Sequence, residues 1–280
     1  MKFKIKAVVA ALAMVAAGGA NAAIQSGVTG NSEVFFSVFD SVNQISYTRD
    51  LGLTLDQILT GQNGSFTYGA DAKLTSFINT ANASSSSLVW NLMTGMDSTF
   101  ADPADFPKWG LYITSNSANV ADVSFEQTFI AIGQAALFAQ GANGDAFAQG
   151  GGSGTNYALN NSATSTGGSG YYGGPYGGNN LGNSLVISDE NAIGQSMAFY
   201  HFGLNLDADG NPVTDENGNL TGAMTKFAGN WTLEADGDLS YASATAPIPL
   251  PPAVLLLGSA LAGLVGVARR NRPQDEALPA

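Results

Sequence analysis

The chain has 280 residues, no cysteine and a formal net charge of −12, with 22 acidic residues against 10 basic ones. The absence of cysteine excludes disulfide bonds and thiol nucleophiles, so stability has to come from packing or from bound ions. A strongly acidic chain repels nucleic acid and anionic membranes, which excludes nucleic-acid binding and leaves divalent cations or simple solubility as reasons for the charge.

The N-terminus carries the three parts of a secretory signal peptide. They are a basic region, an apolar region and an A-x-A cleavage site: Lys2, Lys4 and Lys6, then residues 7–17, then Ala20, Asn21 and Ala22. We expect signal peptidase to remove residues 1–22 and to leave Ala23 as the first residue of the exported protein. The alternative is an uncleaved signal anchor, against which the short apolar region argues.

The exported region, residues 23–245, is long enough for one domain with its own core. Its first half shows the β-branched and aromatic runs that are typical of strands. There are four such runs, of which the first two form a predicted β-hairpin: residues 33–40, 44–48, 88–92 and 109–114. Thr54 and Gln57 form a predicted capping box that opens a short helix ending at Gly61, and a less regular helical stretch covers residues 70–79.

A second capping box, Ser124 with Gln127, precedes apolar residues at helical spacing and predicts a helix that ends near Gly141. The composition then changes. Residues 141–183 are about one third glycine and rich in asparagine and serine, with interspersed tyrosines and no basic residue. Such a segment buries too little surface to offset its ordering entropy, so we expect a long, mobile or loosely packed loop.

The last part of the exported region returns to strand patterns. Residues 184–188 and 196–204 predict strands, and residues 230–242 predict a hairpin closed by a two-residue type I′ turn at Asp236 and Gly237. We expect this hairpin to lie beside the N-terminal strands. The whole predicts a mainly β fold with short helices, either a β-sandwich or an α+β layer, with the glycine-rich loop as an insertion.

One loop has the spacing of a calcium-binding loop. Oxygen-bearing side chains surround Gly210 at the required positions and give these candidate ligands: Asn205, Asp207, Asp209, Asn211, Asp215 and Glu216. The asparagine at the first position and Pro212 at the eighth depart from the pattern. The alternative is an acidic loop with two tight turns, which its Asp-Gly and Asn-Gly pairs favour. Calcium is thus the one candidate cofactor.

No group of residues has the spacing of a catalytic site. His201 is the only histidine, and the chain has no cysteine and no G-x-S-x-G motif to provide a nucleophile, so we expect His201 to pack or to satisfy a hydrogen bond. The pairs Asp102 with Asp105 and Asp236 with Asp238 are too close in sequence to flank a sugar as glycosidase carboxylates do. We therefore do not expect an enzyme.

The C-terminus holds the most specific pattern of the chain. A proline-broken linker precedes an uncharged apolar run and a group of arginines: Ile248, Pro249, Leu250, Pro251 and Pro252, then residues 253–268, then Arg269, Arg270 and Arg272. The prolines keep a helix from starting before Ala253. A transmembrane helix over residues 253–268 would be roughly 24 Å long, and the arginines predict that residues 273–280 stay in the cytoplasm.

This tail, residues 246–272, resembles the PEP-CTERM sorting tail in its VPLPA variant. Ile248 stands for the usual valine, Pro252 stands for the usual alanine, and residues 273–280 extend beyond the usual end. The resemblance implies an exported protein of a Gram-negative bacterium whose tail is cleaved by an exosortase, a membrane cysteine protease, before release to the cell surface or the exopolysaccharide matrix. An uncleaved C-terminal membrane anchor is the alternative.

Two non-enzymatic roles fit these patterns. The expected role is a structural protein of the cell surface or biofilm matrix, and the alternative is a calcium-assisted glycan-binding module whose aromatic residues stack on sugars. Trp90, Trp109 and Trp231 are more typical of a core than of such a platform. The expected partners are signal peptidase and the exosortase, the inner membrane before cleavage, and an exopolysaccharide as a candidate.

Overall fold

The computed structural model describes residues 24–25, 32–61, 64–83, 87–96, 102–117, 120, 123–143, 162–178, 185 and 188–243. The chain divides into two compact units, Met1–Ala244 and Thr245–Ala280, and the described residues belong to the first. The signal-peptide cleavage site and the sorting tail with its predicted helix lie outside the described residues. Within the described part, no helix is both long and apolar enough to cross a membrane.

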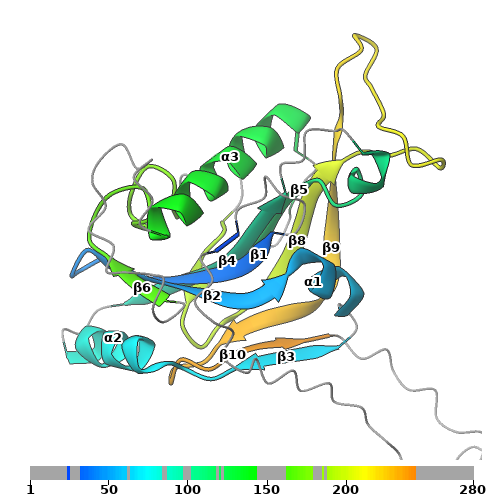
Figure 1. The fold of residues 1–280 in the computed structure, drawn as a ribbon. Helices are drawn as coiled ribbons and strands as arrows, with labels where there is room; N and C mark the ends of the chain where they lie inside the picture. Colours follow the sequence, from blue (N-terminus) through cyan, green and yellow to red (C-terminus); the bar gives the residue numbers. More distant parts are fainter. Residues whose placement is uncertain are drawn as a thin grey trace, which may run out of the picture. The chain divides into compact units, whose positions relative to one another are not determined.

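Ten antiparallel strands of the described chain form one curled sheet, a half-barrel (Figure 1). They are β1 (Glu33–Asp40), β2 (Ile45–Thr54), β3 (Ser65–Tyr68), β4 (Leu88–Met96), β5 (Gly110–Ser115), β6 (Ser162–Ser165), β7 (Asn191–Ala192), β8 (Ser196–Leu204), β9 (Gly222–Leu233) and β10 (Leu239–Ala242). Their order is β3-β10-β9-β8-β5-β4-β1-β2-β6, and β7 pairs with β4 outside this order. The mainly β prediction is confirmed, but a single curled sheet replaces the two sheets of a sandwich.

Among the described residues, three α-helices accompany the sheet: α1 (Leu55–Gly61), α2 (Ala72–Ala83) and α3 (Phe125–Ala142), with one 3₁₀ turn, η1 (Pro103–Asp105). Both predicted capping boxes are present. At α1 the Thr54 backbone N–H donates to Gln57 Oε1 at 2.9 Å, and at α3 the Gln127 N–H donates to Ser124 Oγ at 3.1 Å. These side chains satisfy N–H groups that the first helical turn leaves unpaired, so the two helix starts could be predicted locally.

Alternation along the strands divides the apolar residues between two cores. On β4, Trp90 and Leu92 belong to an inner core, which the curled sheet forms with α1 and α2. Met93 faces the other way into an outer core between the sheet and α3. Figure 1 shows α3 on one face of the sheet, opposite β3 and β10. The period of two in a strand produces this division, and each large side chain fully buried contributes roughly 1.5–3 kcal/mol.

The C-terminal hairpin differs from its prediction in two respects. Strand β9 lies between β8 and β10 in the sheet, and β10 pairs on its other side with β3, so the hairpin does not pair with the predicted N-terminal strands β1 and β2. The turn is also longer than two residues: the Glu234 N–H donates to the Asp238 carbonyl at 2.8 Å and the Gly237 N–H to the Glu234 carbonyl at 2.9 Å. Only Gly237 has a positive φ, whereas a type I′ turn needs two such residues.

The prediction of a loosely packed loop over residues 141–183 is wrong for residues 162–178. Strand β6 pairs with β2, and Tyr171 and Tyr172 are buried. We call residues 166–178 the glycine–tyrosine segment. Its glycines let the backbone approach helix α3 closely. Its tyrosines bury the apolar surface that the prediction of a loose loop had taken to be too small. Of the predicted strand over 184–188, only residues 185 and 188 are described, and neither lies in a strand.

Candidate functional site

The glycine–tyrosine segment closes a pocket of about 360 Å³ that we call the tyrosine pocket. It lies where this segment meets the turn between β1 and β2 and the start of β4. Its walls combine aromatic rings, glycines and polar side chains: Phe39, Ser41, Gln44, Val89, Tyr172, Gly173, Gly174, Gly177, Gly178 and Glu190. A cavity of this size, with apolar walls and a few polar groups, falls in the range of small-ligand sites.

Hydrogen bonds from both tyrosines hold the segment over the pocket. The Tyr172 backbone N–H donates to Ser46 Oγ at 3.1 Å, and the Tyr171 hydroxyl donates to Gln44 Oε1 at 2.9 Å. The Phe39 ring contacts both tyrosine rings, with centroids 5.7 Å from Tyr171 and 5.6 Å from Tyr172. These contacts therefore attach the pocket wall to strands β1 and β2 as well as to the turn between them.

A pair of consecutive carboxylates, Asp189 and Glu190, borders the pocket, and Glu190 is part of its wall. Asp189 is fully buried, and Asn91 Nδ2 of β4 donates to its Oδ2 at 3.3 Å. Asp189 Oδ1 and Asn91 Oδ1 have no hydrogen-bond partner among the described residues. The pKa of Asp189 is raised to about 7, mainly by burial and also by the neighbouring Glu190, while the hydrogen bond from Asn91 opposes the shift. Burial also raises the pKa of Glu190.

The Tyr172 side chain joins the pocket to these carboxylates. Its hydroxyl is buried and shares a hydrogen bond with the Glu190 carboxylate. Burial raises the pKa of Tyr172 well above its usual value, and the negative charges of Asp189 and Glu190 raise it more. The phenol therefore stays protonated at any physiological pH and donates to Glu190.

No described basic side chain neutralises this pair. Residues 23–245 include four basic residues, and each has its contact elsewhere. Arg49 Nη1 donates to the Gly69 carbonyl at 2.7 Å, Lys73 Nζ to the Ser162 carbonyl at 2.7 Å, Lys108 pairs with Asp56 at 2.7 Å, and Lys226 lies 5.8 Å from the centre of the Tyr200 ring. Uncompensated buried carboxylates are costly, which is the reason for the raised pKa values.

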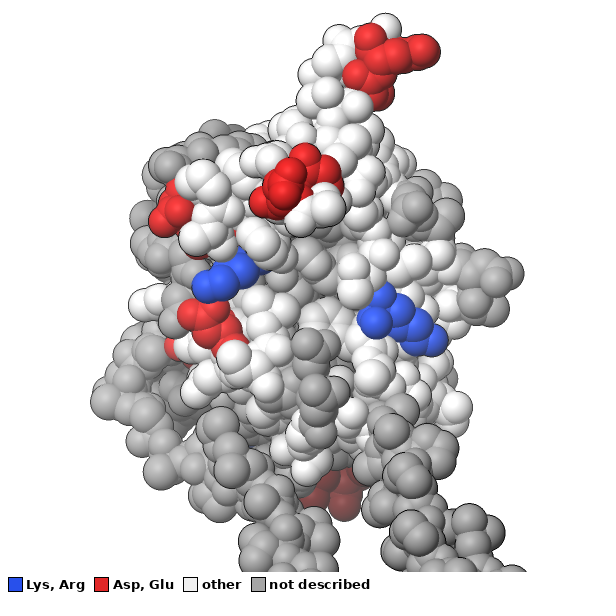
Figure 2. All heavy atoms as spheres, turned by 90° about the vertical axis from the view of Figure 1, so that its right-hand side faces the viewer, with Lys and Arg blue, Asp and Glu red and all other residues white. Residues whose placement is uncertain are grey.

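The predicted calcium loop forms a projecting extension between β8 and β9 (Figure 1), and acidic side chains lie on the projecting part of the surface in Figure 2. Asp207 Oδ1 accepts the backbone N–H groups two and four residues further on, at 2.9 and 2.8 Å, and Asp215 Oδ1 repeats both contacts. The Asn211 N–H contributes most to lowering the pKa of Asp207. This is the double-turn loop that the Asp-Gly and Asn-Gly pairs favoured.

The extension distributes the six candidate calcium ligands over three places. Asn205 stands at its base, and the others divide between two turns: Asp207, Asp209 and Asn211 in the first, Asp215 and Glu216 in the second. Within the described part of the chain, no three His, Cys, Asp or Glu residues gather where a metal ion could be held. Calcium binding by this loop stays a prediction.

His201 packs in the body of the protein. Its Nε2 lies 2.9 Å from the Trp109 carbonyl oxygen, and its ring stacks on Tyr112 with centroids 4.1 Å apart. Burial lowers the pKa of His201 to about 4, so the imidazole is neutral at neutral pH and its Nε2 donates to the carbonyl. The expected packing role is confirmed. Trp90, Trp109 and Trp231 are also fully buried, which confirms that they are core residues and not a sugar platform.

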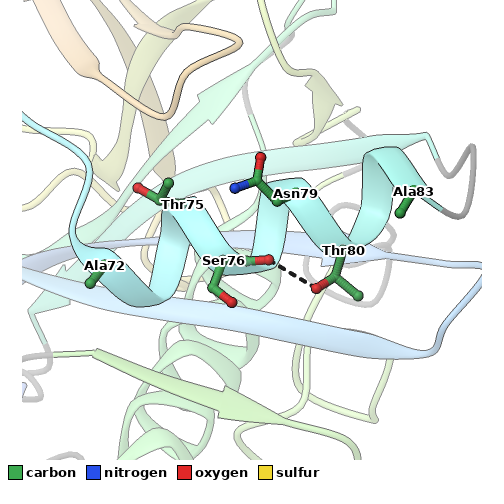
Figure 3. A pocket seen from close by; sticks show the side chains of 6 residues that line it. All are labelled: Ala72, Thr75, Ser76, Asn79, Thr80 and Ala83. Atoms are coloured by element: carbon green, nitrogen blue, oxygen red, sulfur yellow. Dashed lines mark hydrogen bonds between the residues drawn. The ribbon is translucent and has the colours of Figure 1, made fainter.

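Two further hollows border α2. The larger, about 650 Å³, follows the exposed side of the helix and is lined by uncharged residues: Ala72, Thr75, Ser76, Asn79, Thr80 and Ala83 (Figure 3). The Thr80 hydroxyl donates to the Ser76 carbonyl within the same helix at 2.9 Å. The second, about 310 Å³, includes Asp40 and Lys73, but Asp40 accepts the backbone N–H groups of the next turn and Lys73 binds a carbonyl. Neither hollow offers an uncompensated charge.

No family model matches the chain, and no curated protein and no solved structure matches it either. These comparisons add no support to the PEP-CTERM resemblance of residues 246–272.

The tyrosine pocket was not predicted from sequence patterns. Asp189 and Glu190 look like an ordinary polar pair after a glycine-rich stretch, because nothing local indicates that they are covered. One signal was present: Asn91 interrupts the apolar run of β4 at a position that faces the outer core. A buried amide in a strand needs a partner, and this requirement points to a polar group on the covering segment.

Proposed function

We propose that this chain is an exported, non-catalytic structural protein of the bacterial cell surface or exopolysaccharide matrix, sorted and processed through its C-terminal tail. The observation that supports this proposal most is the order of the tail residues: prolines at 247–252, an uncharged run over 253–268, then Arg269 and Arg270. In this proposal an exosortase cleaves a membrane-held intermediate, and signal peptidase has already removed residues 1–22.

The described body is compatible with such processing. Its last strand, β10, ends at Ala242 and pairs with both β9 and β3. Cleavage anywhere within residues 247–252 would leave all the described strands and helices intact. The released product would thus keep the inner and outer cores, and it would carry a net charge of about −16 from the residues counted in the sequence.

The described body also supports a non-catalytic role. The one histidine is neutral and used in packing, and the acidic groups of the extension bind their own backbone. Calcium-assisted glycan binding through exposed tryptophans is disfavoured, because all three tryptophans are fully buried.

Fractionation of the native host tests the sorting proposal. The chain should leave the inner membrane and accumulate in the matrix fraction, and a variant that ends at Ala246 should pass into the periplasm without being retained in the membrane. Arg269→Ala with Arg270→Ala should slow the release of the full chain, because positive residues hold the tail in the membrane for cleavage. Equal release of all three forms would contradict sorting through the tail.

A further inference from the structure

The tyrosine pocket combines aromatic faces, hydrogen-bond acceptors and negative charge without a positive partner. We propose that it binds a small polar ligand through a primary ammonium group, and that an amino sugar is the ligand class that its walls fit best. A charged amine would neutralise the carboxylate pair, and the ring of an amino sugar would occupy the remaining volume between the aromatic and glycine walls.

The charge of the site is the first argument. Glu190 lines the pocket, and Asp189 is buried directly next to it in the chain. The contacts of the four basic residues between 23 and 245 lie elsewhere, so no described side chain supplies a positive charge to the pocket. An ammonium beside Glu190 would form a charge-assisted hydrogen bond, about twice as strong as a neutral one.

The acceptors of the site are the second argument. Glu190 lines the pocket, and Oδ1 of the adjacent buried Asp189 lacks a hydrogen-bond partner among the described residues. An ammonium group has three donors and no acceptor, which matches carboxylate oxygens that no described positive group contacts. The glycines at 173, 174, 177 and 178 line the same pocket, and atoms of the glycine–tyrosine segment occupy the space that their side chains would need.

The aromatic wall distinguishes an organic cation from a metal ion. Phe39 and Tyr172 offer rings on which a cation and the apolar face of a sugar can both rest. Calcium instead needs six to eight oxygen ligands at about 2.3–2.6 Å. Glu190 is the one carboxylate that lines the pocket, and 360 Å³ is far more space than a bare ion requires.

Calorimetric titration of the full chain at neutral pH tests the proposal with three sugars of one ring shape. Glucosamine carries the ammonium group, N-acetylglucosamine replaces it by a neutral amide, and glucose replaces it by a hydroxyl. We expect glucosamine to bind at least about tenfold more tightly than the other two, since only glucosamine forms the charged contact. In amide NMR spectra, the glycine signals of the pocket should move with glucosamine.

Two variants of opposite sign provide the controls. Glu190→Gln should weaken glucosamine binding about tenfold, and Gln44→Glu, which adds a carboxylate to the same wall, should strengthen it several-fold. Glu216→Gln, a matched change on the projecting extension, should have no effect. Thermal melts establish that each variant is folded.

Equal binding of the three sugars, absence of binding to any of them, or unchanged glucosamine affinity in both pocket variants would overturn the proposal. Tighter binding of calcium chloride, with loss of calcium in Glu190→Gln, would also overturn it and assign the pocket to a metal. The pocket would bind an amine whether or not the tail is cleaved, so failure of this proposal leaves the sorting proposal unaffected.

Discussion

Gly141 of α3 and Gly170 of the glycine–tyrosine segment pass each other in direct backbone contact. A Cβ atom on Gly141 would overlap the backbone nitrogen of Gly170, and one on Gly170 would overlap the nitrogen of Ala142. This crossing holds the segment against the end of α3, next to Phe138, which packs on both Phe35 and Tyr172. The close contact at these two glycines therefore positions the segment that lines the tyrosine pocket.

Gly141→Ala should destabilise the protein by about 1–3 kcal/mol, because the methyl group has to push the two backbones apart. The matched control is Gly133→Ala in the same helix, where a Cβ atom would meet nothing within 4 Å. That change should stabilise the protein by about 0.5–1 kcal/mol, since alanine favours a helix. Urea denaturation measures both, and equal effects of the two changes would show that the crossing is not tightly packed.

Two buried carboxyl groups should make the protein more stable at mildly acidic pH. Burial is the main cause that raises the pKa of Asp50 and of Asp189, in each case to about 7. Each group is protonated in the folded state at pH values where it is ionised in the unfolded chain. Their contribution is fully present below the unfolded pKa, about 4, and is lost as the pH rises towards 7.

His201 acts in the opposite direction, because its folded pKa of about 4 lies below its unfolded value, so it removes stability as the pH falls below about 6.5. Asp189→Asn isolates the Asp189 effect. As the pH is lowered from 7 to 4, the free energy of unfolding of wild type should rise by up to about 4 kcal/mol relative to that of Asp189→Asn. A difference that does not depend on pH would contradict the buried position of Asp189.

Two buried tyrosines should both destabilise the protein when their hydroxyl groups are removed. The Tyr47 hydroxyl donates to Asp71 Oδ2 at 2.8 Å, so Tyr47→Phe should cost about 0.5–1.5 kcal/mol. The Tyr172 hydroxyl shares a hydrogen bond with the Glu190 carboxylate, so Tyr172→Phe should cost a similar amount. Chemical denaturation of both variants checks this, and unchanged stability of Tyr172→Phe would contradict the contact with Glu190.

Two glycines with positive φ form a further matched pair, Gly237 in the turn between β9 and β10 and Gly210 on the extension between β8 and β9. Gly237 has a φ of +95°, and a Cβ there would lie 3.0–3.1 Å from side chains of Ala70, Leu74 and Ile78. Gly210 on the extension has a φ of +82°, with nothing within 4 Å. Both alanine variants should lose about 1 kcal/mol of stability because alanine is strained at a positive φ. Gly237→Ala should lower the melting temperature clearly more, because its methyl group also presses on side chains of α2. Similar losses would mean that α2 moves aside freely.

Local patterns predicted most elements of this fold, and long-range packing decided the rest. The capping boxes at Thr54 and Ser124 and the alternation of β1, β4 and β8 depend on neighbours within a few residues. The glycine–tyrosine segment was predicted to be a loose loop because a glycine-rich composition is typical of flexible loops. In the structure, Gly170 of this segment instead permits a close backbone contact with α3. The burial of Asp189 and Glu190 could not be predicted for the same reason. It depends on Tyr172 and on strand β4, whose Asn91 is 98 residues away from its hydrogen-bond partner Asp189.

Intact-mass spectrometry of the protein from the membrane and matrix fractions of its host, with and without the exosortase, tests the sorting proposal most directly. We predict a matrix form that starts at Ala23 and ends within residues 247–252, and that is absent when the protease is absent. A membrane-held form that keeps Arg269 and Arg270 in both strains would contradict the proposal and leave an anchored protein whose tyrosine pocket faces the periplasm.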